Sequence, residues 1–332
     1  MAFSHKTRKE IKIMSKKRHA TNVVTVKSKR PLYKQRGFHL FLMIIPFMAI
    51  VFLLSYLPLH GWSYAFFDWR PGRPMTMERF VGFHHFTSMF MDPFVFEDVL
   101  RVLQNTFAIS FLGILGSPLP LLFAMFLAEI RFSPVKRIVQ TVTTIPNFIS
   151  WVLIYSIAFA MFSVGDGFVN RLLIHIGAID SGINFLASPN NVWITMWAWN
   201  TWRSLGWSAI IYFAAIAGID QEQYEAARVD GAGRFALMRH ITLPGLIPTY
   251  FVLLILAIAN FLNNGMEQFF VFQNPMNRAR IEVLDLFVYN QGMASIQVSF
   301  ATAVGIFRSL VSLILLFSAN RLSKLFRGET IF

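Results

Sequence analysis

Six long apolar stretches constrain the fold of this chain more than any other feature of its sequence. A helix that crosses the hydrocarbon core of a bilayer needs about 20 mostly apolar residues. We therefore predict an all-α membrane protein that crosses the bilayer six times, with a transmembrane domain over residues 38–320. The stretches that meet the requirement are residues 38–59, 105–127, 138–162, 192–218, 246–272 and 300–319.

The amino-acid composition agrees with this prediction and excludes several other classes of protein. Hydrophobic residues make up 55% of the 332 residues and charged residues only 14%, too few charges to cover the surface of a soluble protein. The chain has no cysteine, so it has neither disulfides nor thiolate ligands for a metal. The first apolar stretch is too long for a signal peptide, and no small-residue cleavage site follows it.

A basic arm precedes the first stretch and sets the expected orientation in the membrane. Residues 1–37 contain 12 lysines and arginines against one acidic residue, Glu10. Because positively charged segments stay on the cytoplasmic side, we expect a cytoplasmic N-terminus. With six crossings, the short tail of residues 321–332 is expected there too. A basic arm can bind anionic lipid or nucleic acid, and we favour lipid because the arm lacks a folded recognition element.

One charged loop, residues 219–245, has the pattern of two short helices joined by a tight bend. Asp220 suits the N-terminal cap of the first helix. Gly231 favours the bend, since glycine adopts positive φ without steric cost. In the second helix, apolar residues recur every three positions and form one face. Pro244 suits the start of the next span, where a missing amide proton costs least.

The same loop resembles the EAA loop of ABC-importer permeases. That family's pattern is Glu-Ala-Ala, three residues, Gly, nine residues, Ile, one residue and Leu-Pro. The residues that fill the pattern here, at the same spacing, are Glu225, Ala226, Ala227, Gly231, Ile241, Leu243 and Pro244. The match is highly specific because it fixes every position of the pattern. The alternative is an amphipathic hairpin at the membrane interface.

The resemblance implies an architecture and a mechanism. A type I importer permease has six transmembrane helices and presents this loop as a coupling helix to a partner ATPase. Glu225 would then meet the ATPase surface, and Ala226 and Ala227 would allow close approach. Asp230 and Gly231 would form the bend, which lets the loop transmit a push when the ATPases close. ATP and Mg²⁺ would bind the partner ATPases, and this chain would need no cofactor of its own.

Further stretches are similar to the carbohydrate-uptake members of this family, and within them to LplB-like permeases for oligosaccharides cut from polysaccharides. These stretches are residues 58–72, 96–107, 183–190 and 212–235. The resemblance extends over about residues 38–332 and implies a subunit of the bacterial cytoplasmic membrane. Its partners would be a second, homologous permease, two ATPases and an extracytoplasmic solute-binding protein. An identical second copy is the alternative for the other permease.

Polar residues inside the fifth stretch are candidates for the substrate pathway, because polar side chains are costly within a bilayer. Asn260, Asn263 and Asn264 are three and four positions apart, so we expect them on one face of a continuous helix. An asparagine amide both donates and accepts hydrogen bonds, which suits sugar hydroxyls. In maltose-type permeases a similar Asn pair lines the sugar site, and Asn263 and Asn264 take that place here. Hydrogen bonding between helices is the open alternative.

The fourth stretch is rich in tryptophan and contains one arginine. Trp199 and Asn200 belong to the candidate substrate pathway, because aromatic faces can stack on sugar rings. For the tryptophans near the outer leaflet, an aromatic belt is the alternative. Arg203 is expected either to pair with Glu267 or to bind the carboxylate of an acidic sugar such as a uronate, and we favour the pair. Arg308 in the sixth stretch poses the same choice.

Motifs for other functions are absent from the sequence. It has no Gly-x-x-x-x-Gly-Lys-Ser/Thr phosphate loop and no hydrolase or zinc-protease motif. The adjacent pair His84-His85 lacks the spacing of zinc ligands, so we expect no metal site. An ion-driven secondary transporter is the main alternative, but we find no internal repeat and it would leave the loop match unexplained. We therefore expect a transport subunit that carries an oligosaccharide across the membrane and has no enzymatic activity.

Overall fold

The structure is a computed structural model that describes residues 36–327 of the chain. The regular structure of these residues is helical, and an isolated bridge between Phe67 and Phe80 is the only strand-like pairing that they contain. The chain divides into two units, residues 1–60 and 61–332. The basic arm up to residue 35 and the last five residues, 328–332, lie outside the described residues, as do the predictions that concern them.

The described part of the first unit is one apolar helical run. Helix α2 (Arg36–Val51) continues into a π-helical turn, η2 (Phe52–Tyr56), and then into a 3₁₀ helix, η3 (Leu57–Phe66). Its large apolar side chains are exposed, and Phe47, for example, is 70% exposed. Such a helix needs lipid or protein around it, and Leu40–Phe66 is long and apolar enough to cross a membrane.

Within the described residues, four helices are long and apolar enough to cross a membrane, or up to six if each of two bent helix pairs is one span. This agrees with the six crossings predicted from the sequence. In the second unit, α4 (Pro93–Gly116) and α5 (Leu119–Ala128) together form one such helix. A further candidate span ends with α12 (Leu243–Ala259). The remaining one is the first part of α16 (Val298–Arg327).

The two bent pairs correspond to the fourth and third predicted spans. The fourth is α9 (Val192–Ala217), which meets α10 (Gln221–Val229) at 72°. The third, predicted as one helix over residues 138–162, is divided, and its two halves meet at 108°. A single unbroken helix over residues 138–162 is therefore wrong, although the bent pair can form one span. The parts of the third span are α6 (Ser133–Thr144), the 3₁₀ turn η5 (Ile145–Phe148) and α7 (Trp151–Phe162). Pro146 lies at this break and has no amide proton with which to continue an α-helix.

The fifth predicted span, residues 246–272, is also interrupted. Helix α12 ends at Ala259, and a new helix, α13 (Glu267–Phe272), starts after seven intervening residues. The segment between them, residues 260–266, is called the break below. Gly265 in the break has φ +75°, a left-handed conformation that only glycine adopts without strain. The expectation of a continuous helix through these residues is therefore wrong.

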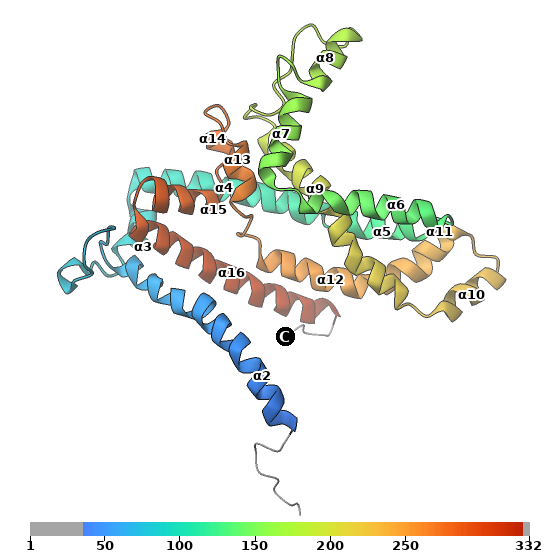
Figure 1. Ribbon diagram of the computed structural model, residues 1–332, viewed down its shortest axis with the longest axis horizontal. Helices are drawn as coiled ribbons and strands as arrows, with labels where there is room; N and C mark the ends of the chain where they lie inside the picture. The colour runs from blue at the N-terminus through green and yellow to red at the C-terminus, as the bar shows by residue number, and fades with distance from the viewer. Residues whose placement is uncertain (1–35, 328–332) are drawn as a thin grey trace, which may run out of the picture. The chain divides into compact units, whose positions relative to one another are not determined.

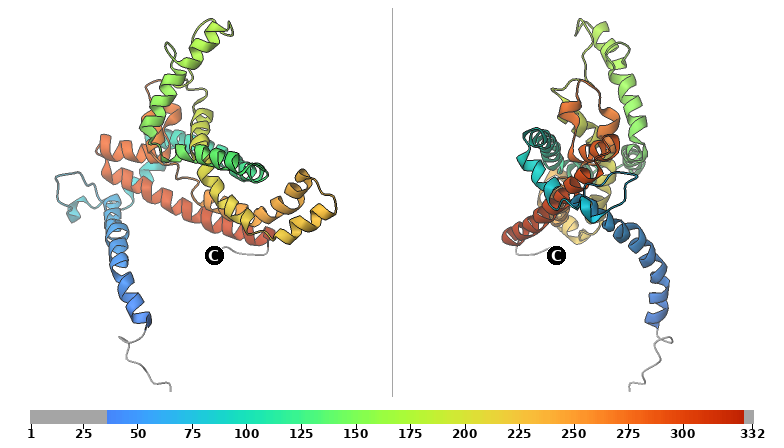
Figure 2. Two further views of the ribbon diagram at one scale, coloured as in Figure 1. Left: turned by 45° about the vertical axis from the view of Figure 1, so that its right-hand side comes forward. Right: turned by 90° about the vertical axis from the view of Figure 1, so that its left-hand side faces the viewer.

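The long helices of the second unit pack lengthwise against one another. Helix α16 lies along α12, and α9 contacts α5 and α6 (Figure 1). Figures 1 and 2 show α7 and α8 (Phe168–His175) leading away from α9. The remaining short helices are η4 (Met77–Arg79), α3 (His84–Met91), α11 (Arg234–Leu237), η6 (Met238–Thr242), α14 (Arg278–Ile281), α15 (Leu284–Tyr289) and η7 (Asn290–Ala294).

Buried apolar side chains form three clusters in the second unit, and the interrupted fifth span takes part in all of them. Leu246 of α12 lies in a cluster with α5 and α9. Phe261 of the break lies in a cluster with α4, α15 and α16. Phe269 of α13, which is 1% exposed, lies in a cluster with α7 and α9. Phe261 and Leu262 pack the break against other parts of the protein, the setting in which irregular backbone is tolerated within a membrane.

Candidate functional site

The first half of the loop at residues 219–245 is held by hydrogen bonds that are local in sequence. Asp220 caps α10, since its carboxylate accepts a hydrogen bond from a first-turn amide at 3.0 Å. At the other end, the amide of Ala232 donates to the carbonyl of Ala227 at 2.9 Å. With a second bond from the amide of Gly231, this is a Schellman motif, which requires positive φ just after the helix. Gly231 has φ +83°, so the bend predicted there is confirmed.

The second half of the loop differs from the prediction. Instead of a separate short helix, α11, η6 and α12 form one continuous helix from Arg234 to Ala259. Pro244 lies inside this helix, just after the π-helical turn η6, where the helical hydrogen bonding is already displaced. Tyr224 of α10 is bound to the same helix, because its hydroxyl lies 3.0 Å from that of Thr242. A displacement of α10 would therefore reach the fifth span directly.

The motif residues of this loop are largely exposed. Within the described residues, no hydrogen bond or ion pair holds the carboxylate of Glu225. The motif is thus free to contact another protein, while its role in coupling stays a prediction. The exposed members are Glu225, Ala226, Asp230, Gly231 and Pro244, and the half-buried ones are Ala227, Ile241 and Leu243.

A small polar cavity lies at the break. Its volume is about 220 Å³, and it lies between α4, α9, the end of α12 and the start of α13. Three of the predicted pathway residues, Asn200, Asn260 and Asn264, line it together. Asn263 and Glu267 do not line it, and both are exposed. The shared helix face predicted for the three asparagines is wrong, because the helix ends at the first of them.

Hydrogen bonds hold one wall of this cavity in place. The hydroxyl of Ser110 donates to the side-chain oxygen of Asn264 at 3.0 Å and also contacts the carbonyl of Phe261. The side-chain amide of Asn264 donates to the carbonyl of Thr106 at 3.4 Å. Asn264 therefore makes the interhelical hydrogen bonds that the sequence left as an alternative to sugar binding. Asn260 instead donates to the carbonyl of Leu256 in its own helix.

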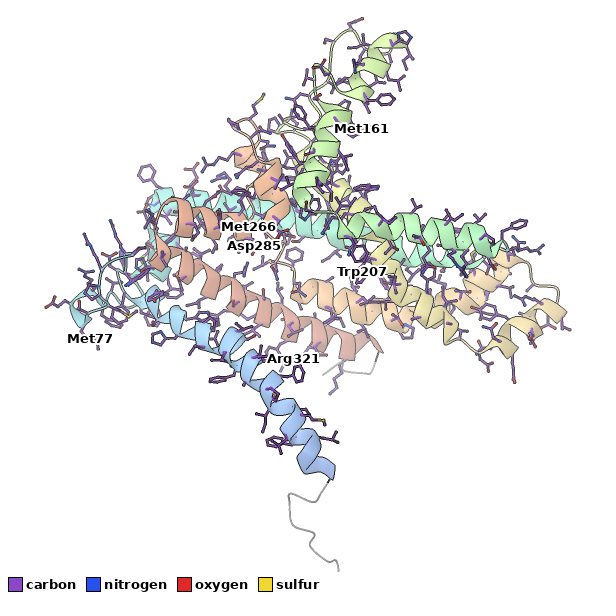
Figure 3. All side chains as sticks on the ribbon, in the orientation of Figure 1. Met77, Met161, Trp207, Met266, Asp285 and Arg321 are labelled. Carbon is purple, nitrogen blue, oxygen red and sulfur yellow. The ribbon has the colours of Figure 1, made fainter. Side chains whose placement is uncertain are left out.

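A carboxylate on the far side of the break joins two further elements to it. One oxygen of Asp285, in α15, pairs with the guanidinium of Arg308, in α16. The other oxygen accepts a hydrogen bond from the amide of Gly265 at 3.0 Å. The two charged side chains are 12% and 28% exposed, so the pair is mostly removed from lipid. Figure 3 shows Asp285 beside Met266, the last residue of the break.

Arg203 does not form the ion pair predicted for it. Its guanidinium donates to two backbone carbonyls of the third span, those of Asn147 at 3.1 Å and Ile149 at 3.3 Å. It also lies 4.8 Å from the ring centroid of Trp151. The expected pair with Glu267 is wrong because the bend in the third span brings carbonyls without helical partners to this arginine. Arg203 thus stabilises that bend.

The tryptophans of α9 are divided among different environments. Trp197 lines the cavity at the break. Trp199 lies in a separate apolar pocket with Trp202, and its ring meets that of Trp202 edge to face. Trp193 donates from its indole nitrogen to the carbonyl of Arg280 at 3.0 Å. The structure therefore brings Trp197, and not the predicted Trp199, to the same cavity as Asn200.

Sequence reasoning missed three residues that shape the break. Ser110 and Thr106 lie on α4, and Asp285 lies between the fifth and sixth predicted spans. Serine and threonine are common within membrane helices, so no local pattern distinguishes these two. Asp285 carried a weak signal, because Arg308 within a span needs a nearby counter-charge.

Four to six apolar helices that are long enough to cross a membrane, with a loop whose motif residues are largely exposed, are the features of a membrane-spanning transport subunit. The chain belongs to the family of binding-protein-dependent transport system inner membrane components, whose family model matches residues 116–328. It is 40% identical to the Bacillus subtilis protein LplB over 88% of this chain and 91% of that protein. It is 39% identical to the B. subtilis polygalacturonan/rhamnogalacturonan transport system permease protein YteP, over 89% and 90% of the two chains.

A solved structure supports the same assignment. A chain of a bacterial alginate ABC transporter, crystallised in complex with an alginate pentasaccharide-bound periplasmic protein, superimposes with a TM-score of 0.78. The two chains are 30% identical, and the match covers 89% of this chain and 97% of that one. The fold is therefore that of an ABC-importer permease.

Proposed function

We propose that this protein forms half of the translocation pathway of an ATP-driven importer for oligosaccharides, including acidic ones such as uronates. The observation that carries this proposal is the exposed Glu-Ala-Ala hairpin, bonded to the interrupted fifth span in a chain of the permease family. The substrate class is supported by YteP, named for polygalacturonan and rhamnogalacturonan transport, and by the alginate transporter.

The hairpin is the proposed contact with a partner ATPase. Glu225 and Ala226 are exposed, and the Schellman bend fixes the end of α10 without using their side chains. Docking of α10 would be felt at Thr242 through the hydroxyl of Tyr224. Because the helix that contains Thr242 continues to Ala259, movement of the hairpin would displace the break at its far end.

The cavity at the break is the proposed substrate contact of this subunit. Amides of Asn200 and Asn260 line it beside Trp197, a combination that can hydrogen-bond hydroxyls and cover an apolar ring face. Asn263 and Glu267 are exposed next to it and would face the second permease or the pathway. In this proposal three further residues do not touch the substrate, because each contacts other parts of the chain. They support the pathway by packing and by holding bends, and they are Trp199, Arg203 and Arg308.

The proposed assembly contains a second, homologous permease, two ATPases that bind ATP and Mg²⁺, and an extracytoplasmic solute-binding protein. Both termini and the hairpin would lie in the cytoplasm, and the basic arm would contact anionic lipid. A heterodimer of permeases is proposed over two copies of this chain, in line with the carbohydrate-uptake resemblance.

Reconstitution into proteoliposomes tests the proposed function. The complete importer, with its binding protein outside and ATP inside, is expected to accumulate a labelled oligosaccharide. Uptake should require ATP and should survive ionophores that collapse proton and sodium gradients. Uptake that is independent of ATP and abolished by ionophores would instead identify an ion-driven transporter and refute the proposal.

A further inference from the structure

A second cleft lies away from the break, between two segments that are distant in sequence. Its volume is about 520 Å³, within the usual range of small-molecule sites. One wall comes from the end of α7 and the turn after it, and includes Asn184, Leu186 and Ala187. The other wall is the turn at residues 274–276. None of the residues that line this cleft lines the cavity at the break.

The first wall is held by one fully buried asparagine. Asn170, on α8, is 0% exposed. Its side-chain amide donates to the carbonyls of Ser163 and Ile183, each at 2.9 Å, and its side-chain oxygen accepts from the amide of Ile183 at 2.9 Å. These bonds fix the segment around Ser163, after α7, to the segment around Ile183, which leads back toward α9.

A second fully buried asparagine connects the two walls. Asn277 is also 0% exposed, and its side-chain oxygen accepts from the amide of Asn274 at 2.8 Å. Its side-chain amide donates to Phe272 in its own segment at 3.1 Å and to Leu186 in the opposite wall at 3.4 Å. Buried polar side chains that are fully bonded specify one arrangement, so the cleft is preformed.

Four side chains that line the cleft carry polar groups with no partner in the part of the chain that the structure describes. They are the amide nitrogens of Asn184 and Asn274, the hydroxyl of Tyr155 and the carboxylate of Asp166. The oxygens of both asparagines accept local backbone amides, and this orients their free donors. Phe159 and Phe162 complete the lining with apolar surface. Amide donors, a carboxylate acceptor and aromatic rings together suit a polyhydroxylated ring.

We propose that this cleft is a second sugar site, which binds one pyranose unit of an oligosaccharide through its hydroxyls. The proposal rests on the proposed function and adds a site for the same substrate class. Asp166 would accept from hydroxyls and would repel a sugar carboxylate, so the cleft recognises the ring and not the acid group. On the proposed topology both walls are extracytoplasmic. An incoming oligosaccharide would therefore reach this site before it reaches the cavity at the break.

Photo-crosslinking on the complete importer tests the site. The probes are a galactotriose and a trigalacturonate, each with a diazirine at the reducing end, and mass spectrometry locates the adducts. The neutral galactotriose should label the wild-type protein within residues 155–166, 184–187 or 274–276, and the trigalacturonate should label these residues less, because Asp166 repels its carboxylates. Replacing both free donors, with Asn184→Asp and Asn274→Asp, keeps the oxygens that accept backbone amides. It should lower labelling by the neutral galactotriose about tenfold, as expected for two lost hydrogen bonds.

Two controls make the result specific. Asn190→Asp makes the same change at an exposed residue of the same segment that does not line the cleft, and labelling should stay at the wild-type level. If the double variant fails to assemble, Tyr155→Phe removes only the free hydroxyl and should lower labelling a few-fold. Adducts confined to the break or to the binding protein, or equal labelling of wild type and variant, would overturn the site. ATP-driven uptake by the same preparation tests the proposed function separately.

Discussion

The helix from Arg234 to Ala259 joins two regions that are built in opposite ways. At its start, the hairpin is shaped by backbone hydrogen bonds between near neighbours and by a hydrogen bond between the hydroxyls of Tyr224 and Thr242. At its end, the break is held by side chains of α4, α15 and α16, through Ser110, Asp285 and Arg308. Locally determined structure leaves its side chains free for a partner, whereas the break depends on the rest of the fold.

This comparison predicts that substitutions at the break act on stability and that substitutions in the hairpin act on coupling. Four changes test it, in order of decreasing expected effect.

Asp285→Ala should have the largest effect. It leaves Arg308 without a counter-charge and Gly265 without an acceptor for its amide. Breaking a buried pair costs about 3–5 kcal/mol, so the thermal unfolding midpoint in detergent should fall clearly. Replacing both members, Asp285→Leu with Arg308→Met, should recover most of the loss. An unchanged midpoint for the single variant would contradict the bracing role of the pair.

Arg203→Ala should come next, because it removes two hydrogen bonds to carbonyls at the bend of the third span. We expect a loss of about 2–3 kcal/mol. Uptake of acidic and neutral oligosaccharides should fall by the same factor, because the guanidinium is occupied by the chain itself. A selective loss of acidic substrates would instead show that Arg203 binds the substrate carboxylate.

Glu225→Lys should leave the stability of the protein unchanged. Glu225 is exposed, and its carboxylate makes no hydrogen bond or ion pair with residues 36–327. ATP-dependent uptake should nevertheless fall at least tenfold, which is a loss of about 1.4 kcal/mol in coupling. Glu222→Lys makes the same charge change in the same helix outside the motif and serves as the control. Full transport by the Glu225 variant would remove the hairpin from the coupling mechanism.

Gly231→Ala should have the smallest effect on uptake, because the side chain that it places at φ +83° strains only the bend itself. Such a residue costs roughly 1–2 kcal/mol in the left-handed region. The penalty should stay local, and hydrogen exchange should become faster in residues 221–232 and remain unchanged around residue 264. Faster exchange at both ends of the helix would show that the two regions are less independent than their contacts indicate.

Sequence reasoning was most successful where the structure is local. The cap at Asp220 and the bend at Gly231 follow from hydrogen bonds within a few residues, so their residue types were sufficient to predict them. The prediction of six crossings rested on hydrophobicity alone, and it agrees with the four to six candidate spans of the structure. The prediction of one unbroken helix for the third span and for the fifth was wrong, because apolar composition indicates which residues lie in the membrane and carries little information on where a helix bends or stops.

Hydrophobic patterning and one spaced motif in the sequence were enough to determine the class of this protein, a permease of binding-protein-dependent transport. Tertiary structure alone decided which polar residues meet. Asn264 joined Ser110 and Thr106, Arg308 joined Asp285, and Arg203 joined the carbonyls of a bend. The physical reason is that a buried polar group takes whichever partner the fold brings within reach, and residues far apart in sequence carry no mark of that proximity.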